Sequence, residues 1–224
     1  MVDKIKIKKD LIQLATSHSP YVVGYEGNVS ARYTDKTFLV KASGKRMNSL
    51  VSDDLVECSW DSVSLDPERR ASMEAPFHSL ILRKTGCNFV AHTHPPHTMR
   101  ILCRNLSSTF ANYRFFPDQV VFNGMKSCLV NYYHPGDELC QAIEKEFDKF
   151  VEIYNTEPKI ILLKNHGIIT WGKTIEECLV KTEICEKSAM IFKEDHKNIC
   201  FLGKDEVKKI LNDEKEKYRQ ILQK

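Results

Sequence analysis

The stretch Phe89-Val90-Ala91-His92-Thr93-His94-Pro95 places two histidines at alternate positions directly after an apolar run. Alternate side chains of a β-strand share one face, so we expect His92 and His94 to lie side by side at the end of a buried strand. A third histidine, His166, follows another apolar run far downstream, in Lys164-Asn165-His166-Gly167. Two neighbouring imidazoles and a third brought in by the fold suit a divalent metal. Three protein ligands would leave a coordination position open for chemistry.

The other five histidines leave the ligand set open at this point. His78 and His97 are the nearest in sequence to the His-x-His pair, and each is an alternative ligand. His18, His134 and His196 lie near the ends of predicted elements and are most simply surface residues. A lone histidine in a core strand is usually structural, but a His-x-His pair together with an isolated Asn-His-Gly favours a metal centre.

The composition is that of an ordinary globular chain. It has 224 residues, of which 42% are hydrophobic and 28% are charged, and single domains of about 200–250 residues are routine. No apolar run approaches the roughly 20 residues that span a bilayer, and the N-terminal segment lacks the apolar core of a signal peptide. We therefore expect one domain over residues 1–224 and no membrane partner.

Charge and motif content exclude several classes of function. Lys and Arg total 33 against 30 for Asp and Glu, so the net charge is only +3 and no basic stripe predicts nucleic-acid binding. The sequence contains neither Gly-x-Gly-x-x-Gly nor Gly-x-x-x-x-Gly-Lys-Ser/Thr, which removes support for dinucleotide or nucleoside triphosphate binding. Its eight cysteines include no Cys-x-x-Cys pair and are interpreted as free thiols in a reducing cytoplasm.

Hydrophobic patterns predict strands and helices in a mixed order. Strands are expected at residues 28–33, 37–41, 55–60, 89–94, 127–133, 159–163 and 168–171. Helices are expected at 3–17, 73–84, 97–104 and 137–154, and after the capping-box pattern at 174–177. Residues 105–124 are expected to be irregular. Early hairpins followed by mixed elements favour a three-layer α/β/α fold with a central sheet covered by helices, and a doubly wound fold is disfavoured.

Two further features concern acid–base chemistry and anion binding. Glu74 lies near the start of a predicted helix, where the helix N-terminus favours a carboxylate, although an ordinary first-turn glutamate has the same appearance. The segments 27–30 and 42–45 flank the first hairpin and combine glycine with small polar residues, as in an anion nest. Ser72 at the helix start could add a donor. Ordinary turns remain the alternative for both segments.

The ordered set of segments resembles the class II aldolase/adducin family, whose best-known type is L-fuculose-1-phosphate aldolase. The matching segments are Gly27-Asn28-Val29-Ser30-Ala31-Arg32, Lys41-Ala42-Ser43-Gly44, Ser72-Met73-Glu74 with His78, His92-Thr93-His94, and Asn165-His166-Gly167. They cover roughly residues 5 to 195. The resemblance implies a mixed, largely antiparallel sheet and a single class II aldolase-like domain over residues 1–224.

The resemblance also implies a role for each matching residue. His92, His94 and His166 match the zinc ligands, although Mn²⁺, Co²⁺ or Fe²⁺ would also accept histidine. Glu74 matches an acid/base residue that can approach the metal. Asn28, Ser43, Gly44 and Ser72 match the positions that bind the substrate phosphate. Met73 departs from the family pattern, where the aldolases carry a second serine, and this leaves room for a different anionic group.

The activity implied is that of a zinc-dependent lyase that cleaves a phosphorylated ketose in carbohydrate metabolism. Retro-aldol cleavage leaves charge on an enediolate, which a divalent metal stabilises. The same motifs are similar to those of sugar-phosphate 4-epimerases, of decarboxylases and of methylthioribulose-phosphate dehydratases. They are also similar to the head domain of adducin, a binding module without catalysis.

The family assembles as a homotetramer with sites between subunits, and a tyrosine of a neighbouring subunit donates a proton. Tyr113 lies in the matching region and is our candidate for that tyrosine, with Tyr132, Tyr133 and Tyr218 as alternatives. Asp118 would be the acid of interest in an epimerase.

Overall fold

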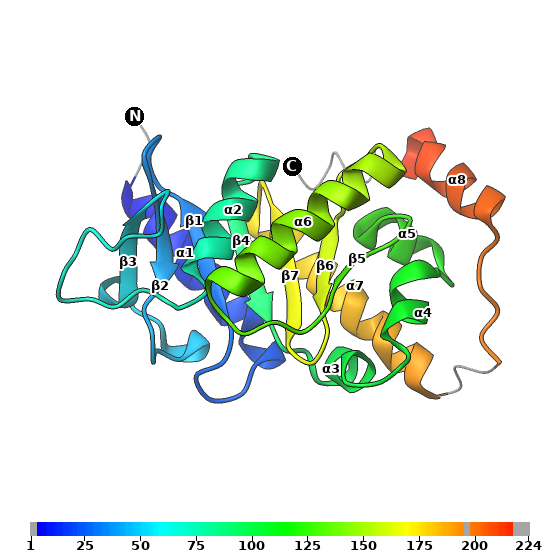
Figure 1. The fold of residues 1–224 in the computed structure, drawn as a ribbon, viewed down its shortest axis with the longest axis horizontal. Coiled ribbons are helices and arrows are strands. Elements are labelled where there is room, and N and C mark those ends of the chain that lie inside the picture. Colours follow the sequence, from blue (N-terminus) through cyan, green and yellow to red (C-terminus); the bar gives the residue numbers. More distant parts are fainter. Residues whose placement is uncertain (1–3, 195–197, 217–224) are drawn as a thin grey trace.

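The computed structural model describes residues 4–194 and 198–216, which fold around a seven-stranded sheet (Figure 1). The strands are β1 Asn28–Arg32, β2 Thr37–Lys41, β3 Leu55–Ser59, β4 Phe89–Thr93, β5 Cys128–Val130, β6 Ile160–Leu163 and β7 Gly167–Gly172. Their order across the sheet is β3-β2-β1-β4-β7-β6-β5. Among the strands of the described residues, only β5 and β6 pair in parallel, so the sheet is mixed and largely antiparallel, as the resemblance implied.

Helices cover both faces of this sheet, which confirms the predicted three-layer α/β/α class (Figure 1). They are α1 Lys4–His18, α2 Ala75–Thr85, α3 Pro96–Leu102, α4 Ser107–Asn112, α5 Pro117–Asn123, α6 Asp137–Tyr154, α7 Ile175–Glu194 and α8 Lys204–Asn212. Single 3₁₀ turns lie at Ser19–Tyr21, Met47–Ser49 and Ser52–Asp54. Among the helices of the described segments, none is long and apolar enough to cross a membrane.

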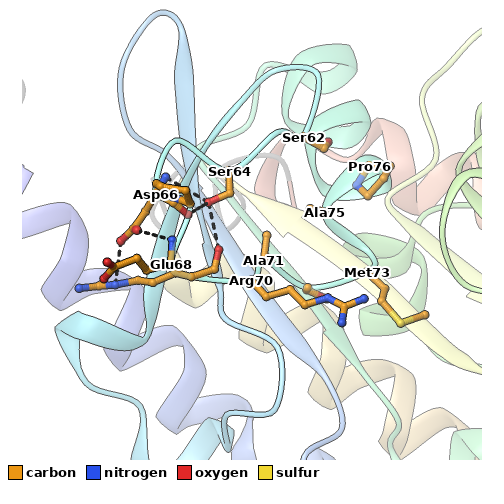
Figure 2. Close-up of a pocket in the computed structure, with 12 residues that line it drawn as sticks. Ser62, Ser64, Asp66, Glu68, Arg70, Ala71, Met73, Ala75 and Pro76 are labelled. Carbon is orange, nitrogen blue, oxygen red and sulfur yellow. Dashed lines mark hydrogen bonds and ion pairs between the residues drawn. The ribbon is translucent and has the colours of Figure 1, made fainter.

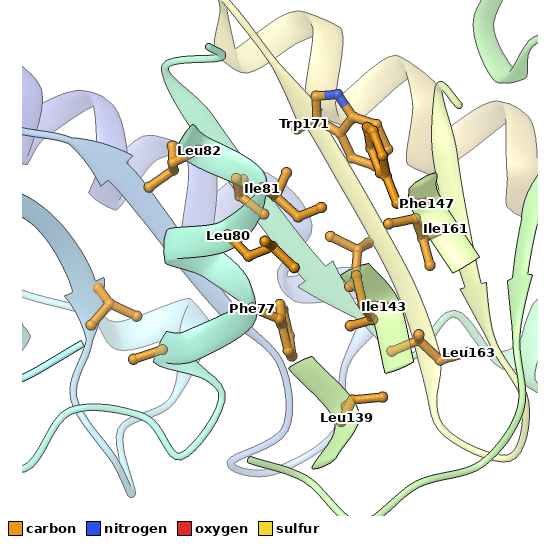
Figure 3. Packing of buried hydrophobic residues seen from close by; sticks show 14 of the residues in the cluster. Phe77, Leu80, Ile81, Leu82, Leu139, Ile143, Phe147, Ile161, Leu163 and Trp171 are labelled. Carbon is orange, nitrogen blue, oxygen red and sulfur yellow. The ribbon is translucent and has the colours of Figure 1, made fainter. Parts of the chain in front are cut away.

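Strand β6 shows how one strand supplies the cores on both sides of the sheet. Ile161 and Leu163 point to the face covered by α2 and α6, where Ile161 lies near Phe147 and Leu163 nearer Ile143 (Figure 3). Ile160 and Leu162 point to the opposite face, which α1 and α7 cover. Burying one such aliphatic side chain contributes about 1.5–3 kcal/mol, so the period-2 pattern fixes which face each strand residue occupies.

Local sequence signals set the ends of the helix that leads into the histidine strand. Pro76 lies in the first turn of α2, where its missing N–H removes no helical hydrogen bond. Gly86 ends the helix in the left-handed conformation, with φ of 63°. The chain then turns directly into β4. Glu74 consequently sits at the N-cap of α2, at the same end of the molecule as the last residues of β4.

The prediction of irregular structure for residues 105–124 is wrong, because this segment forms α4 and α5. Each helix is only one or two turns long, too short to show helical periodicity in the sequence. Burial stabilises them instead: Phe110 and Ala111 join the core under α7. Arg114, which is 2% exposed, lies between the two helices. It donates hydrogen bonds to the carbonyl groups of Phe110, Ala111, Tyr113, Asn123 and Gly124.

Candidate metal centre and active site

Three histidines converge at one end of the sheet, where β4 ends and β6 turns into β7. His92 is on β4, His94 directly follows it, and His166 lies in the tight turn between β6 and β7. Because β4 pairs with β7, that turn is brought against the end of β4. One ring nitrogen from each histidine lies within 4.8 Å of the others, so the group could hold a metal ion. The Nε2 atoms of His92 and His94 are 3.0 Å apart.

Two glycines allow the backbone to approach these rings closely. A Cβ atom on Gly167 would lie 2.5 Å from the carbonyl oxygen of Thr93 and 2.6 Å from Cδ2 of His94. A Cβ atom on Gly27 would lie 2.9 Å from the carbonyl oxygen of His92, and its φ of 69° favours glycine in any case. The glycines in both family motifs are therefore required by the space around the histidines.

Burial of His92 and His94 favours the neutral form that binds metals. His92 is fully buried, and burial lowers its pKa. Burial also lowers the pKa of His94 to about 4, with the neighbouring His92 and His166 acting in the same direction. Neutral imidazole is the metal ligand, so these rings need not lose a proton at neutral pH before binding a cation.

Glu74 faces the same centre from the start of α2. Its Oε1 atom is 3.0 Å from Nε2 of His166, and its Oε2 atom is 3.5 Å from Nε2 of His92. The amide of Asn28 donates a 2.6 Å hydrogen bond to Oε2. Burial opposes ionisation of this carboxyl, but its contacts with the ring nitrogens of His92 and His166, the latter a hydrogen bond, outweigh burial and hold its pKa well below its usual range.

The two alternative ligands lie outside the histidine group. His78 is fully buried, and its Nδ1 atom is 2.7 Å from the hydroxyl of Ser30. Burial lowers the pKa of His78 to about 3. His97 has its Nδ1 atom 3.1 Å from Nζ of Lys193 on α7. Neither belongs to the cluster of possible metal ligands found among the described residues.

The remaining histidines divide between surface and core. His134 is exposed, as expected, and His196 lies outside the described residues. The prediction of a surface position for His18 is wrong, because this residue is fully buried at the end of α1. Its Nδ1 atom is 2.9 Å from the carbonyl of Leu14, which makes it a structural core residue.

The candidate phosphate-binding residues fall into two places. Asn28 is buried and bound to Glu74, whereas Ser43 and Gly44 form an exposed turn. The backbone N–H of Ser43 donates to the carbonyl of Arg70, which brings this turn against the segment that carries Ser72.

Ser72 connects that turn to the histidine centre. Its hydroxyl accepts the backbone N–H of Glu74 at 3.2 Å. Ser72 and Met73 also line an open cavity of about 540 Å³ together with Arg70 (Figure 2). Figure 2 shows the Arg70 side chain extending toward Met73 and away from Asp66. The positively charged side chain of Arg70 therefore lies beside Met73, the position that departs from the family pattern.

Two charged residues near the centre were missed by the sequence analysis. Lys41, at the end of β2, is 3% exposed, and burial lowers its pKa. Its ammonium donates to the carbonyls of Lys45, at 2.6 Å, and Tyr25, at 3.5 Å. Glu26 places a carboxylate oxygen 3.5 Å from Nδ1 of His94. Lys41 belongs to the matching segment Lys41-Ala42-Ser43-Gly44 but was given no role there, and Glu26 carries no signal, because both residue types are expected on the surface.

Tyr113 lies away from the histidines of its own chain. It directly follows α4, is 51% exposed, and packs its ring against that of Phe201 at a centroid distance of 4.9 Å. Within the described segments, no contact joins it to the histidine centre. Tyr132 and Tyr133 are also exposed, and Tyr218 lies outside the described residues.

Comparisons with known proteins identify relatives across most of the chain. The chain is 28% identical to an L-fuculose phosphate aldolase of Methanocaldococcus jannaschii, over 76% of this chain and 86% of that protein. It is 29% identical to a 3-oxo-tetronate 4-phosphate decarboxylase of Haemophilus influenzae, over 83% and 86% respectively. A methylthioribulose-1-phosphate dehydratase of Hahella chejuensis is 26% identical, over 71% and 78%.

Solved structures show the same fold. YgbL from Klebsiella pneumoniae superposes with a TM-score of 0.78 at 23% identity, over 94% of this chain and all of that one. An L-fuculose 1-phosphate aldolase also gives a TM-score of 0.78 at 16% identity, over 96% of each chain. The family model described as Class II Aldolase and Adducin N-terminal domain matches residues 12–192. The chain therefore belongs to the class II aldolase and adducin family.

Proposed function

We propose that the chain is a zinc-dependent aldolase that cleaves a phosphorylated ketose. The observation that carries the proposal is the convergence of His92, His94 and His166, whose ligand atoms lie within 4.8 Å of one another beside the carboxylate of Glu74. Three imidazoles leave the double charge of a zinc ion largely undiminished, and that charge would stabilise the enediolate left by carbon–carbon cleavage. Mn²⁺, Co²⁺ or Fe²⁺ could replace zinc at such ligands.

Glu74 is proposed as the acid/base residue. Its carboxylate is held by the amide of Asn28 and lies at the inner nitrogens of His92 and His166. A carboxylate fixed at that point could take a proton from the substrate hydroxyl or carbon and return it. General acid–base catalysis of this kind contributes about 10²- to 10⁴-fold in rate.

Asn28, Ser43, Gly44 and Ser72 are proposed to bind the substrate phosphate. The hydrogen bond from Ser43 to Arg70 supports this assignment, because it brings the turn and the start of α2 together. Holding the phosphate would orient the reacting carbons relative to the histidines and so lower the entropic part of the barrier.

We propose Tyr113 as a proton donor to a second copy of the chain, in a homotetramer with sites between subunits. Its exposure and its ring contact with Phe201, with no contact to the histidine centre among the described residues, fit a residue that acts in trans. We further propose that residues 1–224 form one domain and that the protein works in the cytoplasm. The eight free cysteine thiols support a reducing compartment.

Decarboxylation of a sugar-acid phosphate is the second candidate. The 29% identity to a 3-oxo-tetronate 4-phosphate decarboxylase favours it, as does the position of Arg70 beside Met73. Both reactions break a carbon–carbon bond and leave an enolate, so the same metal and Glu74 would serve either one.

Metal analysis combined with a panel of sugar phosphates and sugar-acid phosphates tests the proposal. We expect about one zinc per chain and cleavage of a ketose phosphate into two carbon fragments. Release of carbon dioxide would select the decarboxylase, an unbroken carbon chain an epimerase, and loss of water a dehydratase. A purified chain that cannot acquire metal would contradict the enzyme proposal and favour a binding module.

A further inference from the structure

The outward-facing ring nitrogens of the three histidines have different surroundings. Nδ1 of His92 is 2.9 Å from the carbonyl oxygen of Ile168, which can only accept, so we assign the proton to Nδ1 and the lone pair to Nε2. Nδ1 of His166 is buried without a hydrogen-bond partner in the described structure. His94 differs from both, because its Nδ1 atom is 3.5 Å from the carboxylate of Glu26.

The position of Glu26 is fixed by its own turn. The same carboxylate oxygen that faces His94 accepts the backbone N–H of Val23 at 3.1 Å. The backbone N–H of Glu26 in turn donates to the carbonyl of Val23, and Gly24 adopts the left-handed conformation that closes the turn. The backbone carbonyl of Tyr21, two residues before Val23, accepts the backbone N–H of His94 at 3.0 Å. Residues 21–26 therefore hold both the backbone and the ring of His94.

The two neutral tautomers of His94 face different partners. With the proton on Nε2, the ring donates to Nε2 of His92, 3.0 Å away, and its lone pair is on Nδ1, which faces Glu26 and not the centre. With the proton on Nδ1, the ring faces the carboxylate of Glu26, and its Nε2 lone pair is directed into the centre. A carboxylate at that place stabilises the second tautomer and makes the ring a stronger ligand.

We propose that Glu26 is a positioning residue for the metal centre, which holds His94 in the tautomer whose Nε2 atom binds the cation. The proposal rests on the proposed metal-dependent function and goes beyond it, since Glu26 touches neither the cation nor the substrate. The outer nitrogens of the three histidines are then unequal: a carbonyl faces that of His92, a carboxylate faces that of His94, and that of His166 has no hydrogen-bond partner among the described residues.

The test measures zinc binding and ring protonation rather than turnover. Zinc affinity of the full-length chain is determined by competition with a chromophoric chelator for the wild type, Glu26→Gln and Glu26→Ala. We expect the dissociation constant to rise in that order, by about 10- to 100-fold for Glu26→Ala, which is the usual effect of losing an outer carboxylate. Glu152→Gln, an exposed position on α6, makes the same charge change and should leave the affinity unaltered.

Nitrogen-15 NMR of the histidine rings reports the tautomer of His94 directly. A purely structural role of Glu26 would leave that tautomer unchanged. Before zinc is added, the His94 signals should shift from the Nδ1–H form toward the Nε2–H form in Glu26→Ala, while the unfolding midpoint stays near that of the wild type. Zinc affinity within twofold of wild type, or unchanged His94 tautomer signals, would overturn the role of Glu26. A wild-type chain that takes up no zinc would instead overturn the metal-dependent function, and this role with it.

Discussion

The histidine centre differs from the anion turns, which are the proposed phosphate-binding segments at Ser43, Gly44 and Ser72, in how the protein holds each region. His92 is fully buried on a central strand, and Gly27 and Gly167 bring backbone against the histidine rings. Ser43 and Gly44 lie on an exposed turn, and a Cβ atom on Gly44 would meet no other atom within 4 Å. The first region can hold a metal in fixed geometry. The exposed turn has room for other side chains that would suit a different substrate, which is consistent with relatives of different named activities.

Removing one proposed metal ligand should have the largest effect on metal content and turnover. His94→Ala leaves two imidazoles around the centre, so we expect loss of bound metal and of all measurable turnover. Metal content and activity of the same preparation provide the check. Arg83→Ala, at the far end of α2, serves as a surface control and should retain both. Full activity of His94→Ala would remove this histidine from the proposed ligand set.

Glu74→Gln should separate metal binding from catalysis. The amide keeps the size of the side chain but cannot accept a proton, so we expect turnover to fall about 10²- to 10⁴-fold while zinc remains bound. Steady-state kinetics and metal analysis test the two halves of this statement. Unchanged turnover would exclude proton transfer by Glu74, and joint loss of zinc would instead make Glu74 a metal ligand.

Periodicity in the sequence predicted most of the elements that build the histidine centre. The run before His92 alternates as a strand should, and β4, β6 and β7 lie close to the predicted ranges. These elements are buried on both faces, so their apolar residues carry a strong pattern. Residues 105–124 carry no such pattern, because their helices are too short to show helical periodicity; burial and the hydrogen bonds of Arg114 to nearby carbonyl groups stabilise them instead.

Side-chain partners were harder to predict than the elements themselves. The pairing of Asn28 with Glu74 joins residues 46 positions apart, and the contact between Glu26 and His94 depends on the packing of a turn against β4. Charged residues such as Lys41 are normally solvated, so sequence reasoning assigns them to the surface. Only the folded chain shows that Lys41 is buried and that its ammonium binds two loop carbonyls.

A matched pair of glycine substitutions compares the two regions directly. Gly167→Ala places a Cβ atom 2.5 Å from the carbonyl oxygen of Thr93, so the turn carrying His166 must move. Crowding of this kind costs about 1–3 kcal/mol, and we expect weaker zinc binding as well. Gly44→Ala meets no atom, and only its φ of 72° opposes the change, at about 1–2 kcal/mol.

Denaturant unfolding and chelator competition on both glycine variants provide the measurement. The expected distinction is zinc affinity, which should fall in Gly167→Ala and stay at the wild-type value in Gly44→Ala. Equal zinc affinity in the two variants would contradict the idea that close backbone contact holds the histidines in place.

Ser72→Ala should give the smallest effect and shows to which region Ser72 belongs. If its hydroxyl binds the substrate phosphate, the inhibition constant for inorganic phosphate and the KM should each rise about three- to tenfold, the value of one hydrogen bond of about 1 kcal/mol, with kcat unchanged. Ser108→Ala, an exposed residue of α4, is the control. The hydroxyl of Ser72 also accepts the backbone N–H of Glu74. A fall in kcat with unchanged phosphate inhibition would therefore make Ser72 a support for Glu74, and would move it from the anion turns to the histidine centre.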